Sequence, residues 1–552
     1  MSFIYKKYPV LLLLLVLPNC SLNLKAEPEV YIRTNQIGFL PGDLKSAVIL
    51  SSYDLQGKQI QIISSKSKKI VLTCVIRNRR TAYGNFPFTY KVDFSMLKES
   101  GSYYLQYSQE KSYPFKIGND IYNNIADSLL QFFKVQRCGY TNPYLHKECH
   151  ISDAGSLIEG KRIIGKSFDV TGGWHDAGDY IKFLNTIAYS TYILLFSFDF
   201  DPLKFGFDDN RNGIPDILEE AKIGLDWLLR CRYNNEKLIT QVQDLRDHEA
   251  GWRMPEDDTK GFDRPAFIGS GKNLIGIYSA VMALAGRIWK EKLNYPEFAE
   301  KCLKEAERLY SFRNKTRNVD SSGTGSYIDK YYLGKLALGA VELAITTGQK
   351  DYLNDAVSYA DSAGSDYWWS WGDVNSLAHY RLSKYDSKYV NYITKNLETF
   401  NKRKNDNLFE KGAQLTWGTN MTLLGIALQN ILYKRITNDK RFDSLEVAQR
   451  DFILGRNPWG VSFISEFGTN YTRNFHNQVG FLRNRLPGGF SAGPASKGFI
   501  DKKKIQYENP DKYLKFQSTE MYYRDDRQDY VTNEPTITGN ATAIFVMGLY
   551  GK

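Results

Sequence analysis

The sequence predicts a mainly α-helical protein in which an α/α-barrel of helical hairpins follows a small β-sandwich. The chain has 552 residues, more than one ordinary core organises, so at least two modules are expected. Short alternating apolar and polar residues fill the stretch from about Val30 to Ile117, whereas helical periodicity takes over after about Asn119. A hydrophobic content of 42% with 14% aromatic residues indicates a folded globular protein.

The N-terminal module, residues 28–117, consists of strand-like runs separated by turns. Proline, glycine and acidic residues mark turns at 40–43, 54–57 and 99–101. Residues 102–107, with the sequence SYYLQY, have the aromatic content typical of a strand. Several short strands in such a short stretch favour a β-sandwich.

The remainder, residues 120–552, has the spacing of helices. Apolar residues recur on one helical face at Ile121, Ile125 and Leu129 and again at Ile217, Ala221, Leu225 and Leu228. Further helices are expected near 274–290, 296–310, 330–347, 351–363, 374–400, 414–435, 440–454 and 539–549. Roughly a dozen helices separated by long loops suit a barrel of helical hairpins, with function carried by the loops.

Residues 1–26 form a predicted export signal. Lys6 and Lys7 precede an apolar run at 10–17 that is too short to span a bilayer as a mature helix. Cys20 lies in a loose lipobox and is a candidate for lipidation; the alternative is cleavage after Ala26. We therefore expect a secreted, periplasmic or lipid-anchored protein, with no other attachment to a membrane.

The charge balance gives little support to a nucleic-acid partner. The formal net charge is +11, but the basic residues are dispersed and no zinc-finger or RNA-binding motif accompanies them. No nucleic acid is therefore expected as a partner, and we expect the chain to be a monomer.

Residues 172–180, GGWHDAGDY, carry two carboxylates three positions apart, Asp176 and Asp179. Such a pair suits the binding and deprotonation of one water molecule. The neighbouring Trp174 and Tyr180 offer rings that can pack against sugar faces. The alternative is a tight Asx-type turn with no catalytic role.

A second carboxylate candidate, Glu534, lies just before a predicted C-terminal helix. Hydrolysis of a glycosidic bond needs a proton donor for the leaving oxygen and a base or nucleophile across the sugar, commonly from distant parts of the chain. The alternative for Glu534 is a helix cap.

Two groups of residues have the spacing of metal ligands. Cys138, Cys149, His150 and His175 suit tetrahedral Zn²⁺, whereas a Cys138–Cys149 disulfide is the alternative. Residues 208–219 fit a calcium-loop pattern with the candidate ligands Asp208, Asn210, Asn212 and Glu219. Against calcium, no clear helix precedes this loop, and Asp216 can instead cap a helix that starts there.

Taken together, these stretches resemble glycoside hydrolase family 9, over nearly the whole mature chain. The matching stretches are RTNQIGFLP at 33–41, YPFKI at 113–117, GGWHDAGDY at 172–180, LGRNP at 454–458 with Ser462 and Phe463, and DYVTNE at 529–534. The first two resemble the start and end of the family's immunoglobulin-like module. The resemblance implies an (α/α)6 barrel for the catalytic domain.

The resemblance also assigns roles to the carboxylates. It implies that Asp179 is the general base, that Asp176 helps to hold the water, that Glu534 is the general acid and that Asp525 is a supporting carboxylate. Family members invert the anomeric carbon, which requires carboxyl groups about 6.5–9.5 Å apart. Glu534 must then be protonated near neutral pH, whereas Asp179 stays ionised. A structural zinc on the Cys and His set is implied too, with no organic cofactor.

The resemblance implies further sugar-binding positions and shows some departures. The implied positions are His248, Trp252, Tyr327, Trp371, Trp417 and His476, any of which can instead belong to the barrel core. An arginine of the family is Gln478 here, an aromatic position is Gly539, and Met421 replaces an arginine found in some members. The loss of an aromatic and of charged donors leaves room for a branched or modified glucan, or a non-cellulosic β-glycan, as alternative substrates.

The sequence thus predicts an inverting hydrolase of β-1,4-glucans in cellulose-like polysaccharides, acting within the chain. One alternative is a family relative with exo action or another sugar specificity, such as an exo-β-glucosaminidase. The other alternative is a glycan-binding protein without catalysis, against which the presence of Asp176, Asp179 and Glu534 argues.

Overall fold

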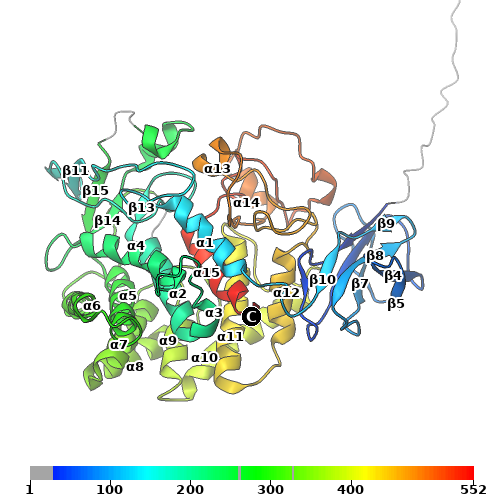
Figure 1. Cartoon of the computed structure of the whole chain (residues 1–552), viewed down its shortest axis with the longest axis horizontal. Helices are drawn as coiled ribbons and strands as arrows, with labels where there is room; N and C mark the ends of the chain where they lie inside the picture. The colour runs from blue at the N-terminus through cyan, green and yellow to red at the C-terminus, as the bar shows by residue number, and fades with distance from the viewer. Residues whose placement is uncertain (1–28, 259–262, 326–328, 552) are drawn as a thin grey trace, which may run out of the picture.

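The computed structural model describes residues 29–258, 263–325 and 329–551, so the predicted export signal with Cys20 and the predicted sugar-binding Tyr327 lie outside the described residues. The β-sandwich and the helical domain lie side by side, with the sandwich at one end of the molecule (Figure 1). Within the described residues, no helix combines the length and apolar character that crossing a bilayer requires.

The N-terminal module is a sandwich of two sheets. Its strands are β1 (Val30–Arg33), β2 (Gly38–Phe39), β3 (Ser46–Ser51), β4 (Gln59–Ser64), β5 (Ile70–Val75), β6 (Arg79–Arg80), β7 (Phe88–Asp93), β8 (Gly101–Tyr107), β9 (Glu110–Lys111) and β10 (Phe115–Ile117). One sheet has the order β1-β3-β7-β6 and the other β2-β10-β8-β4-β5, with β9 against β8. Side chains such as Ile49, Ile62 and Leu105 fill a core of their own between the sheets.

The helical domain is built around a closed inner ring. The ring helices within the described residues are α2 (Leu184–Phe200), α5 (Lys272–Glu291), α7 (Leu333–Thr347), α9 (Asn375–Leu382), α11 (Thr419–Thr437) and α15 (Ile537–Gly548). Each packs against the next, and α15 closes the ring on α2. These helices are buried on nearly all sides because the ring interior covers one face and an outer layer covers the other.

The outer layer consists of α1 (Ile125–Gln136), α4 (Asp216–Arg230), α6 (Pro296–Tyr310), α8 (Lys350–Ala363), α10 (Lys388–Asn405) and α12 (Asp443–Ile453). Each packs on an inner helix, for example α6 on α5 and α8 on α7. The predicted (α/α)6 barrel preceded by a β-sandwich is therefore confirmed. Short helices in the loops are α3 (Pro202–Phe205), α13 (Gln478–Leu482) and α14 (Lys497–Asp501), with 3-10 turns η1 (Leu245–Glu249), η2 (Pro255–Asp257) and η3 (Leu514–Phe516).

The structure differs from the predicted elements in three places. The single helix predicted near 374–400 is two helices, α9 and α10, and the turn between them includes a hydrogen bond from the Lys388 N–H to the Asp386 carboxylate at 2.8 Å. Helix α2 was not predicted, since every residue except Asp199 is buried and no polar face marks its period. A third sheet was also missed; its strands are β11 (Ser156–Glu159), β12 (Arg162–Gly165), β13 (Lys182–Phe183), β14 (Leu238–Val242) and β15 (Pro265–Gly269).

The sandwich docks on the barrel through two of the stretches that carried the family resemblance. The Gln36 N–H donates to the Leu454 carbonyl at 2.9 Å, and Arg33 Nε donates to the Pro458 carbonyl at 2.9 Å. The Lys91–Glu410 ion pair, at 2.7 Å, adds a contact at this interface. The stretches at 33–41 and 454–458 therefore join the two domains.

Candidate active site

The predicted site residues come together because they precede inner-ring helices. Asp176 and Asp179 precede α2, Glu534 precedes α15, and Trp371 and Trp417 precede α9 and α11. In a barrel of helical hairpins each outer helix returns the chain, so all inner helices run in one direction and their N-terminal ends lie at the same end of the barrel. Residues far apart in the sequence therefore lie around one opening.

The base segment, residues 172–180, is held from behind by buried hydrogen bonds. The Gln136 side chain at the end of α1 donates to the His175 and Ala177 carbonyls at 3.1 and 2.6 Å, and Trp174 Nε1 donates to Glu220 at 2.8 Å. Trp174 and Tyr180 are both buried, so the prediction that their rings contact sugar is wrong. Their rings instead fix the segment to the barrel.

Asp179 divides its two carboxylate oxygens between a turn and the opening. Oδ1 accepts the Ile181 N–H at 2.9 Å, which is the Asx turn considered as an alternative, and Oδ2 accepts a hydrogen bond from His248 Nε2 at 2.7 Å. This hydrogen bond raises the pKa of His248 above its ordinary value. Strand β13 pairs with β14 and so holds η1, which carries His248, beside the base segment.

Glu534 is a buried carboxyl group that faces the same segment. Its Oε1 accepts the Gly178 N–H at 3.3 Å. Burial raises the pKa of Glu534 well above its ordinary value, and the charges of Asp179 and Asp176 raise it further. Glu534 does not cap α15, because the Thr536 side chain does so by accepting the Gly539 N–H at 3.0 Å.

Gly178 permits the close approach between the base segment and the rest of the site. A Cβ at this position would lie 2.1 Å from the His476 carbonyl oxygen, so a larger residue would push the two segments apart. The His476 N–H donates to the Asn533 carbonyl at 3.2 Å, which connects the same stretch to residues 523–536, called the acid segment because they include Glu534. The stretch around His476 thus joins the base and acid segments.

A cavity of about 250 Å³ contains Asp176 and Glu534 in its wall. Trp371 and Trp417, both predicted to bind sugar, line it, and so do the two departures Met421 and Gly539. The remaining lining residues are Trp368, Ser370, Gly418, Thr422, Phe490, Ser491, Ala492, Thr536 and Thr538. Aromatic walls with a few polar groups are typical of sugar-binding sites.

Two further predicted sugar-binding residues, Trp252 and His476, pack against each other. The Trp252 ring packs edge-on against His476 with a centroid separation of 5.3 Å, and burial lowers the pKa of His476. Gln478, which replaces the family's arginine, accepts the Arg253 N–H at 3.0 Å and is buried. Gln478 therefore holds the loop that carries Trp252.

Asp525 contacts backbone amides beside the site. Its Oδ1 accepts the Arg473 and Asn474 N–H groups at 3.1 and 2.8 Å, and its Oδ2 pairs with Lys512 at 2.8 Å. Both oxygens therefore hold protein groups. This arrangement suits the supporting role implied by the resemblance.

Comparison with known proteins settles the family. The model of glycosyl hydrolase family 9 matches residues 122–547, and the model of the cellulase N-terminal ig-like domain matches residues 27–112. The chain belongs to glycosyl hydrolase family 9. It is accordingly a glycoside hydrolase.

Relatives of this family 9 enzyme share about a quarter of its residues. A cellodextrinase from Butyrivibrio fibrisolvens is 26% identical over 94% of this chain and 98% of its own, and endoglucanase D from Acetivibrio thermocellus is 26% identical over 94% and 82%. A solved metagenome-derived family 9 endoglucanase has a TM-score of 0.81 at 23% identity, covering 95% of this chain and 99% of its own. A Zn-binding triple mutant of a family 9 endoglucanase has a TM-score of 0.80 at 22% identity, covering 93% and 99%.

The four predicted zinc ligands converge behind the base segment of this family 9 enzyme. One ligand atom of each of Cys138, Cys149, His150 and His175 lies within 4.8 Å of the others. The His150 Nδ1 to His175 Nε2 distance is 3.1 Å, and the two cysteine sulfurs lie 3.7 and 4.0 Å from these nitrogens. Tetrahedral zinc with its usual bond lengths needs separations of about 3.3–3.8 Å, so the 3.7 Å distance fits and the other two lie a few tenths of an ångström outside this range. The donor types, two thiols and two imidazoles, are those of a structural zinc site. Both cysteines are free thiols, so the alternative of a Cys138–Cys149 disulfide is not realised.

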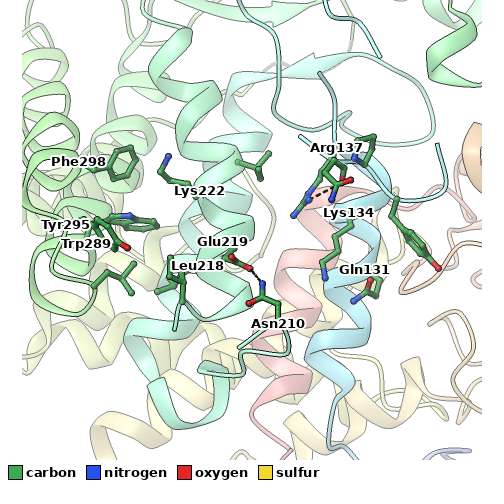
Figure 2. A pocket seen from close by; sticks show the side chains of 16 residues that line it. Gln131, Lys134, Arg137, Asn210, Leu218, Glu219, Lys222, Trp289, Tyr295 and Phe298 are labelled. Carbon is green, nitrogen blue, oxygen red and sulfur yellow. Dashed lines mark hydrogen bonds between the residues drawn. The ribbon is translucent and has the colours of Figure 1, made fainter. Parts of the chain in front are cut away.

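The predicted calcium residues also lie together, but on the surface. Figure 2 shows Asn210 joined by a hydrogen bond to Glu219, at 2.8 Å, in a hollow of about 930 Å³ between α1, α4 and the turn from α5 to α6. Asp208 accepts the Asn212 and Gly213 N–H groups at 3.1 and 2.8 Å. The Asp216 side chain accepts the Asp209 N–H at 3.3 Å, so its predicted role as a cap of α4 is wrong. The predicted catalytic carboxylates do not line this larger hollow.

Several residues of the site were missed at the level of sequence. Phe490, Thr538 and Trp368 line the cavity, and Lys182 Nζ lies 3.6 Å from the Cys138 sulfur while pairing with Asp153 at 2.8 Å. Lys182, two positions after the base motif, was the one residue whose place in the sequence hinted at a role. The others depend on contacts between distant segments.

Proposed function

We propose that this family 9 enzyme hydrolyses β-1,4-glucosidic bonds of cellulose-like β-glucans with inversion, cutting within the chain. The observation that carries the proposal is Glu534, a buried carboxyl with a raised pKa in a cavity that also contains Asp176 and three tryptophans. A carboxyl group that stays protonated near neutral pH can act as the acid. The names of the relatives, a cellodextrinase and an endoglucanase, support a glucan substrate.

The proposed reaction is a single displacement. Glu534 donates its proton to the glycosidic oxygen as the bond from that oxygen to the anomeric carbon breaks. A water molecule held by Asp176 and Asp179 attacks the anomeric carbon from the opposite face, and Asp179 accepts the proton that the water loses. Exchange of protons with solvent then restores both carboxyl groups.

A substrate panel tests this proposal. Purified protein is incubated with soluble β-1,4-glucan, xyloglucan, xylan and chitosan, with the Glu534→Gln variant as control. We expect cleavage of at least one β-1,4-glucan by the parent protein, a rapid fall in viscosity that marks internal cuts, and no measurable cleavage by the variant. No cleavage of any panel member by the parent protein would refute the proposed function, and equal activity of the variant would refute Glu534 as the acid.

We also propose that Cys138, Cys149, His150 and His175 bind a structural zinc ion. Four protein ligands leave no open position, so bound zinc would act as a cross-link in the fold. The His150 Nε2 donates to Asp258 at 3.1 Å, which orients the ring so that Nδ1 faces the other ligands. Elemental analysis of freshly purified protein tests the site, and we expect one zinc ion per chain. Absence of zinc, together with a Cys138–Cys149 disulfide found by mass spectrometry, would reject the site.

Calcium at Asp208, Asn210, Asn212 and Glu219 stays a prediction. Its support is the spacing of the loop and the close approach of Asn210 and Glu219. Calcium titration followed by calorimetry tests it, with the Glu219→Gln variant as control. Heat of binding that is equal in both proteins would place the ion elsewhere.

We propose, finally, that the protein is exported. The two lysines and the short apolar run at the start of the sequence support an export signal. Fractionation of cells that express the full chain tests this, and a Cys20→Ser variant separates a lipid anchor from simple secretion. Retention of the full-length chain in the cytoplasm would refute export.

A further inference from the structure

Five aromatic rings form a continuous strip across the site. In order they are Phe481, Trp252, His476, Tyr530 and Trp417, and we call them the aromatic strip. Successive centroids are separated by 5.2, 5.3, 5.9 and 5.5 Å. The strip joins a loop of the barrel, the stretch around His476 and the acid segment.

The strip passes directly beside the catalytic segments. His476 Nδ1 donates to the Arg527 carbonyl at 2.7 Å, and its own carbonyl lies against Gly178 of the base segment. Trp417, at one end, lines the cavity that contains Glu534, whereas Phe481, at the other end, lies outside that cavity. A sugar chain that is bound along the whole strip therefore extends beyond the cavity, past the proposed catalytic residues Asp179 and Glu534.

The Phe481 end is fixed in place. Helix α13, which carries Phe481, is tied to the base segment because Asn477 Nδ2 donates to the Ala177 carbonyl at 3.1 Å and the Gln478 N–H donates to the Gly178 carbonyl at 3.1 Å. Phe481 nevertheless keeps 37% of its surface exposed. A ring held this rigidly presents its apolar surface at little entropic cost to a ligand.

Arg527 completes this end of the strip. Its guanidinium carbon lies 3.6 Å from the Phe481 ring centroid and 5.9 Å from that of Trp252. Its Nε pairs with Glu508 at 2.6 Å, which fixes the guanidinium plane. The guanidinium therefore stacks on one face of Phe481, and the exposed remainder of the ring lies next to a planar group of N–H donors. This combination matches a pyranose, whose ring face is apolar and whose rim carries hydroxyl groups.

We propose that Phe481 and Arg527 form a sugar-binding subsite beyond Trp252, on the side of the catalytic pair away from the Trp417 cavity. The ligand is a β-linked gluco-oligosaccharide long enough to reach Phe481, so the subsite rests on the proposed β-glucan hydrolysis. It makes the enzyme prefer long chains. It also sets which bond of a long oligosaccharide lies at Glu534.

The test compares Phe481→Ala with Leu482→Ala on β-1,4-gluco-oligosaccharides of three to six units. Leu482 is the matched control because it lies on the same helix, is 42% exposed and does not belong to the strip. We expect Phe481→Ala to lower kcat/KM about tenfold for the six-unit substrate, with a shift in its cleavage positions, and to leave the shortest cleaved substrate within about twofold. We expect Leu482→Ala to match the parent protein at every length.

Arg527→Lys supplies a second measurement, since it keeps the charge but removes the planar donor group. We expect it to lose activity selectively on the long substrates, as Phe481→Ala does. Equal kcat/KM for parent and Phe481→Ala at every length, or an equal fall at all lengths, would overturn the subsite. Failure of the parent protein to cut any gluco-oligosaccharide would instead refute the proposed function, so the two failures are distinguishable.

Discussion

The base segment and the acid segment face the same opening, but the protein holds them by different means. The base segment, residues 172–180, is held by groups from remote parts of the chain, such as Gln136 and the predicted zinc ligands Cys149 and His150, which lie beside its own His175. The acid segment, residues 523–536, is fixed largely by its own carboxylates, which accept backbone N–H groups. Asp526 accepts those of Glu508 and Asn509 at 3.1 and 3.0 Å.

The two carboxyl groups of these segments also lie in different surroundings. Asp179 sits in a turn with one oxygen toward His248, so polar groups surround it. Glu534 is enclosed, and burial together with the charges of Asp179 and Asp176 raises its pKa. Disruption of one segment should therefore reach the other only through the contacts at Gly178 and His476, and the predictions below test how far the two segments are independent.

The largest effect is expected from Asp179→Asn. The amide cannot accept a proton from water, so we expect kcat on soluble β-1,4-glucan to fall at least about 10³-fold with the melting temperature nearly unchanged. Steady-state kinetics and thermal melting measure the two quantities. A fall of less than about tenfold would mean that another group is the base.

The next effect is expected from loss of a metal ligand in Cys149→Ser, with Cys74→Ser as the control because Cys74 lies outside the cluster. We expect Cys149→Ser to lose zinc, to unfold at a lower temperature and to lose activity by loosening the base segment next to His175. Hydrogen exchange should rise in residues 172–180 but not in residues 523–536. An equal increase in hydrogen exchange in both segments would show that the two segments are not independent.

A smaller effect is expected from Asp525→Asn, which tests the acid segment. Loss of the charged acceptor for the Arg473 and Asn474 N–H groups should lower kcat about 10- to 100-fold while KM stays within about twofold. Lys512→Gln is the control, since removing this half-exposed partner should change kcat by less than about twofold. If kcat falls equally in both variants, then the Lys512–Asp525 ion pair, and not the hydrogen bonds from the Arg473 and Asn474 N–H groups, positions the acid segment.

The pH profile gives a further test because Glu534 has a raised pKa. Glu534 must be protonated to act, so kcat/KM should stay constant to a pH above the ordinary pKa of a glutamate. It should then fall as the pH rises through the folded-state pKa of Glu534. The same sign applies to folding: the contribution of this group to stability is complete below the unfolded-state pKa and is lost as the pH rises through the folded-state pKa. An activity that increases steadily with pH would contradict the role of Glu534 as an acid.

The smallest expected effect concerns His248. Its hydrogen bond to Asp179 raises its pKa, so the imidazole signal should titrate above the ordinary value of 6.5 and shift downward in Asp179→Asn. Nuclear magnetic resonance of the ring protons measures both values. An identical titration in the two proteins would show that the two side chains do not interact in solution.

The sequence predicts much of the fold because the outer helices are amphipathic, with one apolar face against the inner ring. Helix α2 was not predicted and has no polar face that marks its period, and the strands of the third sheet are short segments within loops. The candidate site was predictable where motifs carry it, as for Asp176, Asp179 and Glu534. The burial of Trp174 and the exposure of Phe481 depend on which segments pack together, and local sequence does not contain that information.

The anomeric form of the first product tests the account most directly. Proton magnetic resonance during the first minutes of hydrolysis of a β-1,4-glucan distinguishes the two anomers before they equilibrate. Attack by a water held at Asp179, opposite the proton donor Glu534, predicts that the α-anomer accumulates first. Initial accumulation of the β-anomer would contradict the account, because it would require a carboxylate to act as a nucleophile and form a covalent intermediate.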